Sequence, residues 1–441
     1  MTARLFVTAD NHLNRFTARL TVSRLEDRRR RLRHAFRQVV DAAIEAKAAA
    51  LILGGDTFDA VDPRNLERAA FARMLRRLRD AGVAVVATGG NHDSPRQSTD
   101  HGGYGPFAEF EEARLLHYLG IPDEGGDVKH VIIESDGQVI AVAGTPWRPA
   151  TDGDPIFGLT FPEIRHDLSE PHRGRAADWR VFVTHASVEG HTYPGPLEPV
   201  IRRQTIANLE ADLIVVGHVH QHMVSVIPCP SGRQCHVVVP GSTERMTFGE
   251  ADVRPGYFVV DLPSHGALTV SRRSIAAQPR IVLEIPSTEL TPESLGGLRA
   301  DAVDATGSVV RRLEAVADTD TMASLRIHGP ALREVLDDLN LAAIHAFGAH
   351  AFFGFDLDAS GLIPADLGGA SSTIGERRTA VDEVRATIES MATGASGDER
   401  AVLEEAWARI VPILGGLGSD AHVTPTPDAT TGSNDAERAT A

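Results

Sequence analysis

Short apolar runs alternate with amphipathic stretches over the first ninety residues of the chain. The runs at residues 5–8, 49–53 and 83–87 consist almost entirely of apolar side chains, which predicts buried strands. Residues 24–47 and 65–79 carry apolar side chains at helical spacing among charged ones, which predicts helices. Strands joined by helical crossovers are typical of a layered α/β fold.

Strand-like runs become denser after residue 130, and fewer helical patterns separate them. They lie at residues 131–133, 139–142, 181–183, 213–216, 236–239 and 256–261. The second half of the first domain is therefore expected to be richer in strands than the first half.

A domain boundary is expected near residues 276–280. A fresh strand pattern at 281–285 begins shortly after Pro279, and proline cannot donate to a strand ladder. A Pro-, Thr- and Asp-rich composition predicts disorder at the end of the chain, while an apolar stripe at helical spacing before it favours a packing face. The expected parts are a catalytic domain at 1–275, a small α+β module at 281–360, a helical segment at 374–415 and a disordered tail at 419–441.

Composition limits the possible partners and compartment. The chain has 441 residues and a formal net charge of -16, so any contact with nucleic acid must be local. The N-terminus has no signal-peptide pattern, and no apolar run approaches the roughly 18 to 20 residues that span a bilayer, so we expect a cytoplasmic protein without membrane partners. Cys229 and Cys235 can pair, bind metal or do neither. The lack of flanking metal ligands and a reducing cytosol favour free thiols.

Metal-ligand residue types follow five of the predicted strands. Parallel strands end at the same edge of a sheet, so these residues are expected to converge. Two metal ions about 3.5 to 4 Å apart need a bridging ligand and further donors for each ion. Mixed oxygen and nitrogen ligands without thiolate suit Mn(II), Fe(II) or Zn(II) better than Ca(II). The clusters are Asp10-Asn11-His12, Gly55-Asp56 through Asp59, Gly90-Asn91-His92-Asp93, Thr184-His185 and Gly217-His218-Val219-His220.

Each cluster alone also has a purely structural interpretation. Asp-x-His and Gly-Asp-x-x-Asp occur in turns and helix caps. A turn that uses asparagine at positive φ explains Asn91 but not His92 or Asp93. The histidines of Gly-His-x-His share one face of a strand, where they can simply be partly exposed. The occurrence of all five clusters in order favours a metal site.

Taken together, the clusters resemble the five phosphoesterase motifs of the calcineurin-like metallophosphoesterases. Three segments are similar to the SbcD-like DNA-repair nucleases within that superfamily: Ala9–Leu13, Gly55–Asp59, and Pro240-Gly-Ser-Thr-Glu-Arg245 with Arg254-Pro-Gly-Tyr257. The resemblance covers residues 1–275. It implies a layered fold of two central mixed sheets flanked by helices, followed by a smaller α+β capping domain.

The resemblance also implies a set of metal ligands. Asp10, His12, Asp56 and His220 would hold one divalent ion, and Asp56, Asn91, His185 and His218 the other, with Asp56 as the bridge. Mn(II) is the expected metal. Asn14 stands where relatives usually have glycine, and a left-handed turn would suit asparagine.

Two further residues are candidates for proton transfer. His92 follows the ligand Asn91 without being required as a ligand itself, so we expect it to be the general acid for the departing 3′-oxygen. Asp93 is expected to orient the His92 ring. The alternatives are a structural hydrogen bond for His92 and a loop anchor for Asp93. His101 lies in a glycine-rich loop that either meets substrate or has only a loop role.

A local basic run lies at residues 28–37. Arg28 and Arg31 are the candidates for neutralising DNA phosphates. A solvated helix face balanced by Glu26 and Asp27 is the alternative interpretation.

The leading hypothesis for function is an SbcD-type, Mn-dependent DNA exonuclease and endonuclease, with 3′-5′ polarity expected, that works in double-strand-break repair at the nucleoid. The resemblance implies a homodimer and an SbcC-like SMC-family ATPase as partner, and the helices at 376–414 are candidates for contacting its coiled coil. The alternatives are a phosphoesterase for small or cyclic nucleotides and a non-catalytic metal-binding scaffold.

Overall fold

A computed structural model describes residues 2–95, 100–120, 128–148, 154–159, 176–191, 198–290 and 303–365. All of them belong to one compact unit, Met1–Ala365. The expected helical segment at 374–415 and tail at 419–441 lie outside the described residues. No described helix is both long and apolar enough to cross a membrane.

The first sheet has six strands in the order β14-β13-β1-β2-β3-β4. β1 through β4 run parallel, and β13 pairs antiparallel with β1 and β14. This mixed sheet contains the strands predicted at 5–8, 49–53, 83–87 and 256–261. Its members are β1 (Thr2–Thr8), β2 (Ala50–Leu53), β3 (Ala84–Ala87), β4 (His117–Tyr118), β13 (Gly256–Pro263) and β14 (Thr269–Ser274).

The second sheet also has six strands, in the order β11-β12-β10-β7-β6-β5. It contains the other strands predicted before residue 240. Cys229 and Cys235 lie at its β11–β12 hairpin as buried free thiols, as predicted. The members are β5 (Lys129–Ser135), β6 (Gln138–Gly144), β7 (Trp179–His185), β10 (Leu213–Gly217), β11 (Met223–Pro228) and β12 (Gln234–Val239); a separate pair is formed by β8 (Ser187–Val188) and β9 (Val200–Ile201).

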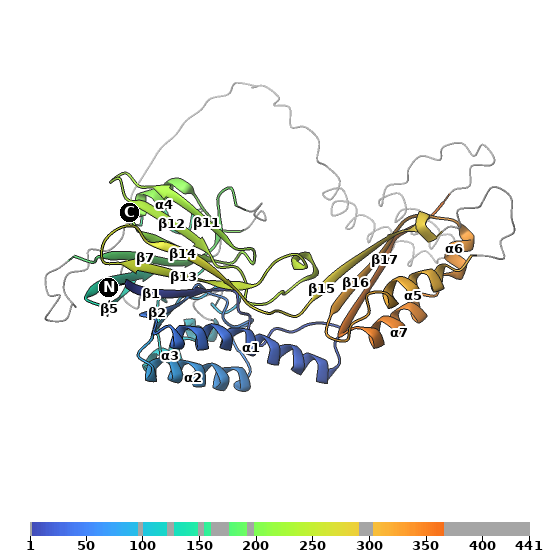
Figure 1. The fold of residues 1–441 in the computed structure, drawn as a ribbon, viewed down its shortest axis with the longest axis horizontal. Coiled ribbons are helices and arrows are strands. Elements are labelled where there is room, and N and C mark those ends of the chain that lie inside the picture. The colour runs from blue at the N-terminus through green and yellow to red at the C-terminus, as the bar shows by residue number, and fades with distance from the viewer. Residues whose placement is uncertain are drawn as a thin grey trace, which may run out of the picture. The chain divides into compact units, whose positions relative to one another are not determined.

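The two sheets pack face to face with helices on their outer faces. One apolar cluster joins alternate residues of both sheets, such as Leu5 and Val7 with Val183 and Val215. Helices α1 (Val22–Glu45), α2 (Asn65–Asp80) and α3 (Ala108–Glu112) cover the first sheet through a second cluster, and α4 (Arg203–Leu209) covers the second sheet (Figure 1). The expected layered fold of two mixed sheets flanked by helices is confirmed.

Helix α1 illustrates how the sequence pattern sets this packing. Thr21 caps its first turn by accepting a hydrogen bond from the Arg24 backbone N–H. Leu32, Phe36, Val39 and Ala43 recur every three or four residues and are fully buried. The helix therefore turns one apolar stripe to the sheet, and among its charged residues Arg28 is buried while the others are at least partly exposed.

Residues from Arg280 onward build a sheet of their own. β15 (Arg280–Pro286), β16 (Met322–Ala331) and β17 (Gly354–Pro364) are parallel, in that order. One face of this sheet is packed against the apolar faces of three helices: α5 (Ala305–Glu314), α6 (Arg333–Asp338) and α7 (Leu341–Ala351). This module has an apolar core of its own.

Candidate metal centre

The loops that follow β1 and β2 run side by side and are joined through their backbones. The Asp10 N–H donates to the Gly55 carbonyl at 3.1 Å, and the His12 N–H donates to the Asp56 carbonyl at 2.9 Å. In the loop that follows β3, the His92 N–H donates to the Asp56 carboxylate at 2.8 Å. Parallel strand order thus brings motifs that are distant in sequence to one edge of the sheet.

Several of the expected metal ligands have a backbone conformation that L-residues rarely adopt. The φ angles are 51° for Asp10, 44° for His12, 48° for Asp56 and 95° for His218. Such conformations cost about 1 to 3 kcal/mol each and concentrate at functional sites. Asn14, at the position noted for its departure from glycine, has φ 79°, so the left-handed turn predicted there is present.

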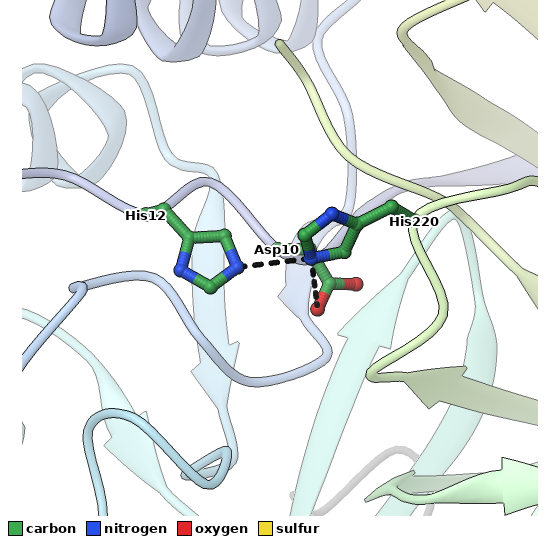
Figure 2. Close-up of side chains that lie close together, drawn as sticks. All are labelled: Asp10, His12 and His220. Atoms are coloured by element: carbon green, nitrogen blue, oxygen red, sulfur yellow. Dashed lines mark hydrogen bonds and ion pairs between the residues drawn. The ribbon is translucent and has the colours of Figure 1, made fainter. Parts of the chain in front are cut away.

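Asp10, His12 and His220 form one group of donors (Figure 2). The Nε2 atoms of His12 and His220 face each other at 3.1 Å, and His220 Nε2 lies 3.9 Å from an Asp10 oxygen. The opposite nitrogen of each ring contacts a carboxylate: His12 Nδ1 lies 3.0 Å from Asp59, and His220 Nδ1 lies 3.0 Å from Glu250.

A second group forms around Asn91. Its side-chain oxygen lies 3.1 Å from His185 Nε2 and 3.0 Å from His218 Nδ1. Asp56 lies between the two groups, because one of its oxygens is 3.8 Å from His12 Nε2 and 3.5 Å from His185 Nε2. The structure therefore brings all seven expected ligands together, with Asp56 in a bridging position.

These residues fit divalent metal ions. When each Nδ1–H of His12 and His220 donates to its carboxylate, both facing Nε2 atoms carry lone pairs. Two lone pairs 3.1 Å apart repel each other unless a proton or a metal ion lies between them. A carboxylate behind a ligand histidine is also the usual outer support of a metal site, since it fixes the tautomer and the ring orientation.

The protonation states of these residues are compatible with metal binding. Burial lowers the pKa of His12, which favours the neutral imidazole that binds metal. Burial alone would raise the pKa of Asp56, but the neighbouring His185 and His12 hold it well below its usual range. Burial opposes protonation of His185 as well, yet the Asp56 charge raises its pKa to about 9. A divalent ion at His185 would compete with this proton.

Gly90 permits the close approach of the loop after β3 to Asp56. A Cβ built at Gly90 would meet the Asp56 carboxylate oxygen at 2.1 Å and the Asp56 backbone nitrogen at 2.5 Å. We expect Gly90→Ala to displace the bridging carboxylate and weaken the binding of both metal ions, measured by calorimetric titration. Gly82→Ala, at the opposite end of β3, is the control for metal affinity: a Cβ there meets nothing within 4 Å, and its positive φ of 76° adds only local backbone strain away from the site. Unchanged metal affinity in Gly90→Ala would contradict this interpretation.

His92 lies at the mouth of the site, but its partner is not the expected one. Its Nδ1 lies 3.3 Å from the Asp59 carbonyl oxygen and 3.7 Å from the Asp59 carboxylate. Asp93 instead accepts hydrogen bonds from the backbone N–H groups of Gly90 at 2.7 Å and Phe58 at 3.1 Å. The expectation that Asp93 orients the His92 ring is therefore wrong: Asp93 anchors the loop, and Asp59 lies beside the ring.

Burial explains the separate character of Asp93. It is completely buried, and together with the nearby Asp56 charge this raises its pKa to about 7.

Asp59 also contacts His12 and accepts a hydrogen bond from Arg15 at 2.9 Å. In the sequence, Asp59 was marked only as the last residue of Gly-Asp-x-x-Asp. That pattern is found in metal sites and also in turns and helix caps.

A cavity of about 470 Å³ opens beside the metal ligands. Asn91, His92 and His101 line it, together with Asp59 and Ser94. His101, which the sequence left between a loop role and a substrate role, is exposed at this cavity. A group bound there can reach both a metal ligand and the expected general acid.

The two arginines expected at DNA have other partners. Arg28 is only 1% exposed, lies 3.1 Å from the Glu244 carboxylate and donates to Gln278 at 3.0 Å. It cannot contact DNA phosphates from this position, so that expectation is wrong. Arg31 is partly exposed, pairs with Asp320 and lies over the Phe353 ring at 5.3 Å.

The Pro240–Arg245 segment has a structural role that its sequence did not reveal. The Ser242 N–H donates to the His220 carbonyl at 3.0 Å, and the Thr243 hydroxyl donates to Asn11 at 3.0 Å. Glu244 accepts from the Gln278 N–H at 3.1 Å and 3.2 Å. This segment therefore supports the metal loops on one side and holds the connection to the β15 module on the other.

Comparison with known proteins agrees with this geometry. A family model described as calcineurin-like phosphoesterase matches residues 3–222. A protein named DNA double-strand break repair protein Mre11 from Methanosarcina mazei is 28% identical over 275 residues, which cover 62% of this chain and 38% of that protein. The protein of the same name from Methanopyrus kandleri is 24% identical over 274 residues, 60% of this chain and 55% of that protein.

Two further similarities are more distant. The uncharacterized metallophosphoesterase YhaO of Bacillus subtilis is 23% identical over 51% of this chain and 48% of its own length. A crystal structure of a dimetal phosphatase from Danio rerio is 11% identical and covers 62% of this chain and 96% of that one, with a TM-score of 0.35. The matched part of the chain thus spans well under two thirds of these curated relatives. The family match and the site geometry together identify residues 3–222 as a calcineurin-like phosphoesterase domain, and the chain belongs to that metallophosphoesterase superfamily.

Proposed function

We propose that this chain is a metal-dependent nuclease that hydrolyses the phosphodiester bonds of DNA. The observation that carries the proposal is the convergence of seven oxygen and nitrogen donors around Asp56, next to a cavity that contains His92. DNA as the substrate is supported by the similarity to proteins named for DNA double-strand break repair.

The two groups of donors would each hold one metal ion. Asp10, His12, Asp56 and His220 would hold one ion, and Asp56, Asn91, His185 and His218 the other. Two bound divalent ions lower the pKa of a bound water and offset negative charge on the phosphate oxygens.

His92 supplies the proton for the leaving group. A water loses one proton to the solvent as its oxygen forms a bond to phosphorus; the bond from phosphorus to the 3′-oxygen breaks, and that oxygen takes its proton from His92. The His92 ring is 38% exposed at the cavity, and its Nδ1 contacts Asp59. Because Nδ1 faces the Asp59 carbonyl and carboxylate, Nε2–H is the donor to the leaving oxygen.

The finer features belong to the same proposal. Mn(II) is the expected metal, with 3′-5′ exonuclease and endonuclease activity, a homodimer, and an SbcC-like SMC-family ATPase as partner at the nucleoid. They are supported by the motif resemblance and by the mixed oxygen and nitrogen donor set. A phosphoesterase for small or cyclic nucleotides is the competing function.

Linear duplex DNA labelled at one end tests the proposal. We expect the purified chain to cleave it with Mn(II), less well with Mg(II), and not with chelator. Asp56→Asn, which alters the bridging carboxylate, should abolish cleavage and so exclude a contaminating nuclease. Hydrolysis of bis(4-nitrophenyl) phosphate without cleavage of DNA, with or without a partner ATPase, would contradict the nuclease and favour the small-substrate enzyme.

A further inference from the structure

The histidines of the candidate metal centre are supported in two different ways. Behind His185, the Nδ1 nitrogen lies 2.9 Å from the neutral backbone carbonyl of Gly54. Behind His220, the Nδ1 nitrogen lies 3.0 Å from the Glu250 carboxylate. A carboxylate is a stronger hydrogen-bond acceptor than a carbonyl and makes the opposite ring nitrogen a better ligand.

Glu250 is itself held firmly. It is 12% exposed at the end of the short helical turn η4 (Phe248–Glu250). The Met246 N–H donates to one of its oxygens at 2.8 Å, and the Thr247 hydroxyl donates to the other at 2.9 Å. The oxygen that faces His220 therefore has a fixed position.

The turn is braced from the other side by the first residue of β15. The Arg280 guanidinium lies over the Phe248 ring at 5.1 Å, and Arg280 is 6% exposed. Glu250 lies outside residues 3–222, the part of the chain that matches the family model. None of the five motifs includes it.

We propose that Glu250 is a positioning residue for the metal ligand His220: it holds the imidazole so that Nε2 faces Asp10 and His12. This inference rests on the metal site of the proposed function and is independent of the substrate. Loss of the carboxylate frees the ring to rotate and to change tautomer, so it weakens the ion held by Asp10, His12 and His220. The ion near Asn91, His185 and His218 keeps its support.

Titration of the metal-free protein with Mn(II) alone, followed by calorimetry, tests the proposal. For Glu250→Ala we expect about 10- to 100-fold weaker binding of one ion, as is usual when an outer carboxylate is removed, and unchanged binding of the other. Glu250→Gln keeps the shape and an acceptor oxygen, so it should lose less affinity, but measurably, for the same ion.

Glu210→Ala is the matched control. Glu210 also accepts from a backbone N–H, that of Ser231 at 3.0 Å, and from the Ser231 hydroxyl. It lies at the C-terminal end of α4 beside the β11–β12 turn, and it has no histidine partner among the described contacts. We expect it to bind both ions as the wild type does.

Three results would overturn the proposal: wild-type affinity for both ions in Glu250→Ala, an equal loss for both ions, or wild-type binding in Glu250→Gln when Glu250→Ala does not fold. The thermal midpoint of the metal-free variants separates misfolding from a specific loss. A wild-type chain that binds two Mn(II) ions without cleaving DNA would contradict the proposed function alone.

Discussion

Replacing His92 by serine is expected to lower the rate of DNA hydrolysis by about 100- to 10,000-fold while Mn(II) binding stays unchanged, because a positioned general acid contributes a factor of that size. The ring lies at the cavity, and its Nδ1 contacts Asp59. Rates under single-turnover conditions, with metal affinity measured on the same samples, give the comparison.

The leaving group distinguishes proton donation from a structural role. A nitrophenolate departs without a proton, so the loss in His92→Ser should be much smaller on bis(4-nitrophenyl) phosphate than on DNA. His34→Ser, at an exposed position on α1, is the control and should leave the rate of hydrolysis of both substrates unchanged. Equal losses on DNA and on the chromogenic substrate would remove His92 from the role of general acid.

Removing the Glu244 carboxylate is expected to cost about 3 to 5 kcal/mol of unfolding free energy, the usual effect of breaking a buried ion pair. Arg28 is 1% exposed and Glu244 is 2% exposed, with 3.1 Å between their charged groups. In Glu244→Ala the buried Arg28 charge loses its partner, and the Gln278 N–H loses its acceptor. Denaturant-induced unfolding of the metal-free protein measures the effect.

Two variants make this stability test specific. Asp27→Ala breaks the exposed pair with Arg30, where the side chains are 43% and 68% exposed, and should cost about 0 to 1 kcal/mol. The double variant Arg28→Met with Glu244→Leu removes both charges and should recover the part of the lost stability that comes from the unpaired Arg28 charge. If Glu244→Ala were no more destabilising than Asp27→Ala, the buried pair would not hold this part of the fold together.

The burial of Arg28 and Glu244 also changes the meaning of two sequence patterns. The basic run at 28–37 suggested phosphate contacts, and the Pro240–Arg245 segment was a main basis for DNA as substrate. Arg28 and Glu244 pair with each other inside the protein, next to the connection to β15. DNA as the proposed substrate is therefore supported by similarity to the repair proteins, and Arg28 adds no phosphate contact to that support.

The sequence by itself determined the strands and the ligand clusters, because both depend on local patterns. A buried strand is a short apolar run, and the ends of parallel strands meet at one edge, so the order of the motifs predicted that Asp10, Asp56 and Asn91 converge. His185 and His218 follow strands of the second sheet, and the packing of the two sheets brings them to the same place. The left-handed turn at Asn14 is also a local property.

The tertiary structure alone decided which carboxylate supports each histidine and which arginine is buried. Asp59, and not the adjacent Asp93, lies beside His92, because the loop after β2 folds against the loop after β3. Glu250 reaches His220 across 30 positions, and Glu244 reaches Arg28 across more than 200. Such pairs depend on how loops approach one another in space, and neither spacing nor periodicity along the chain encodes that approach.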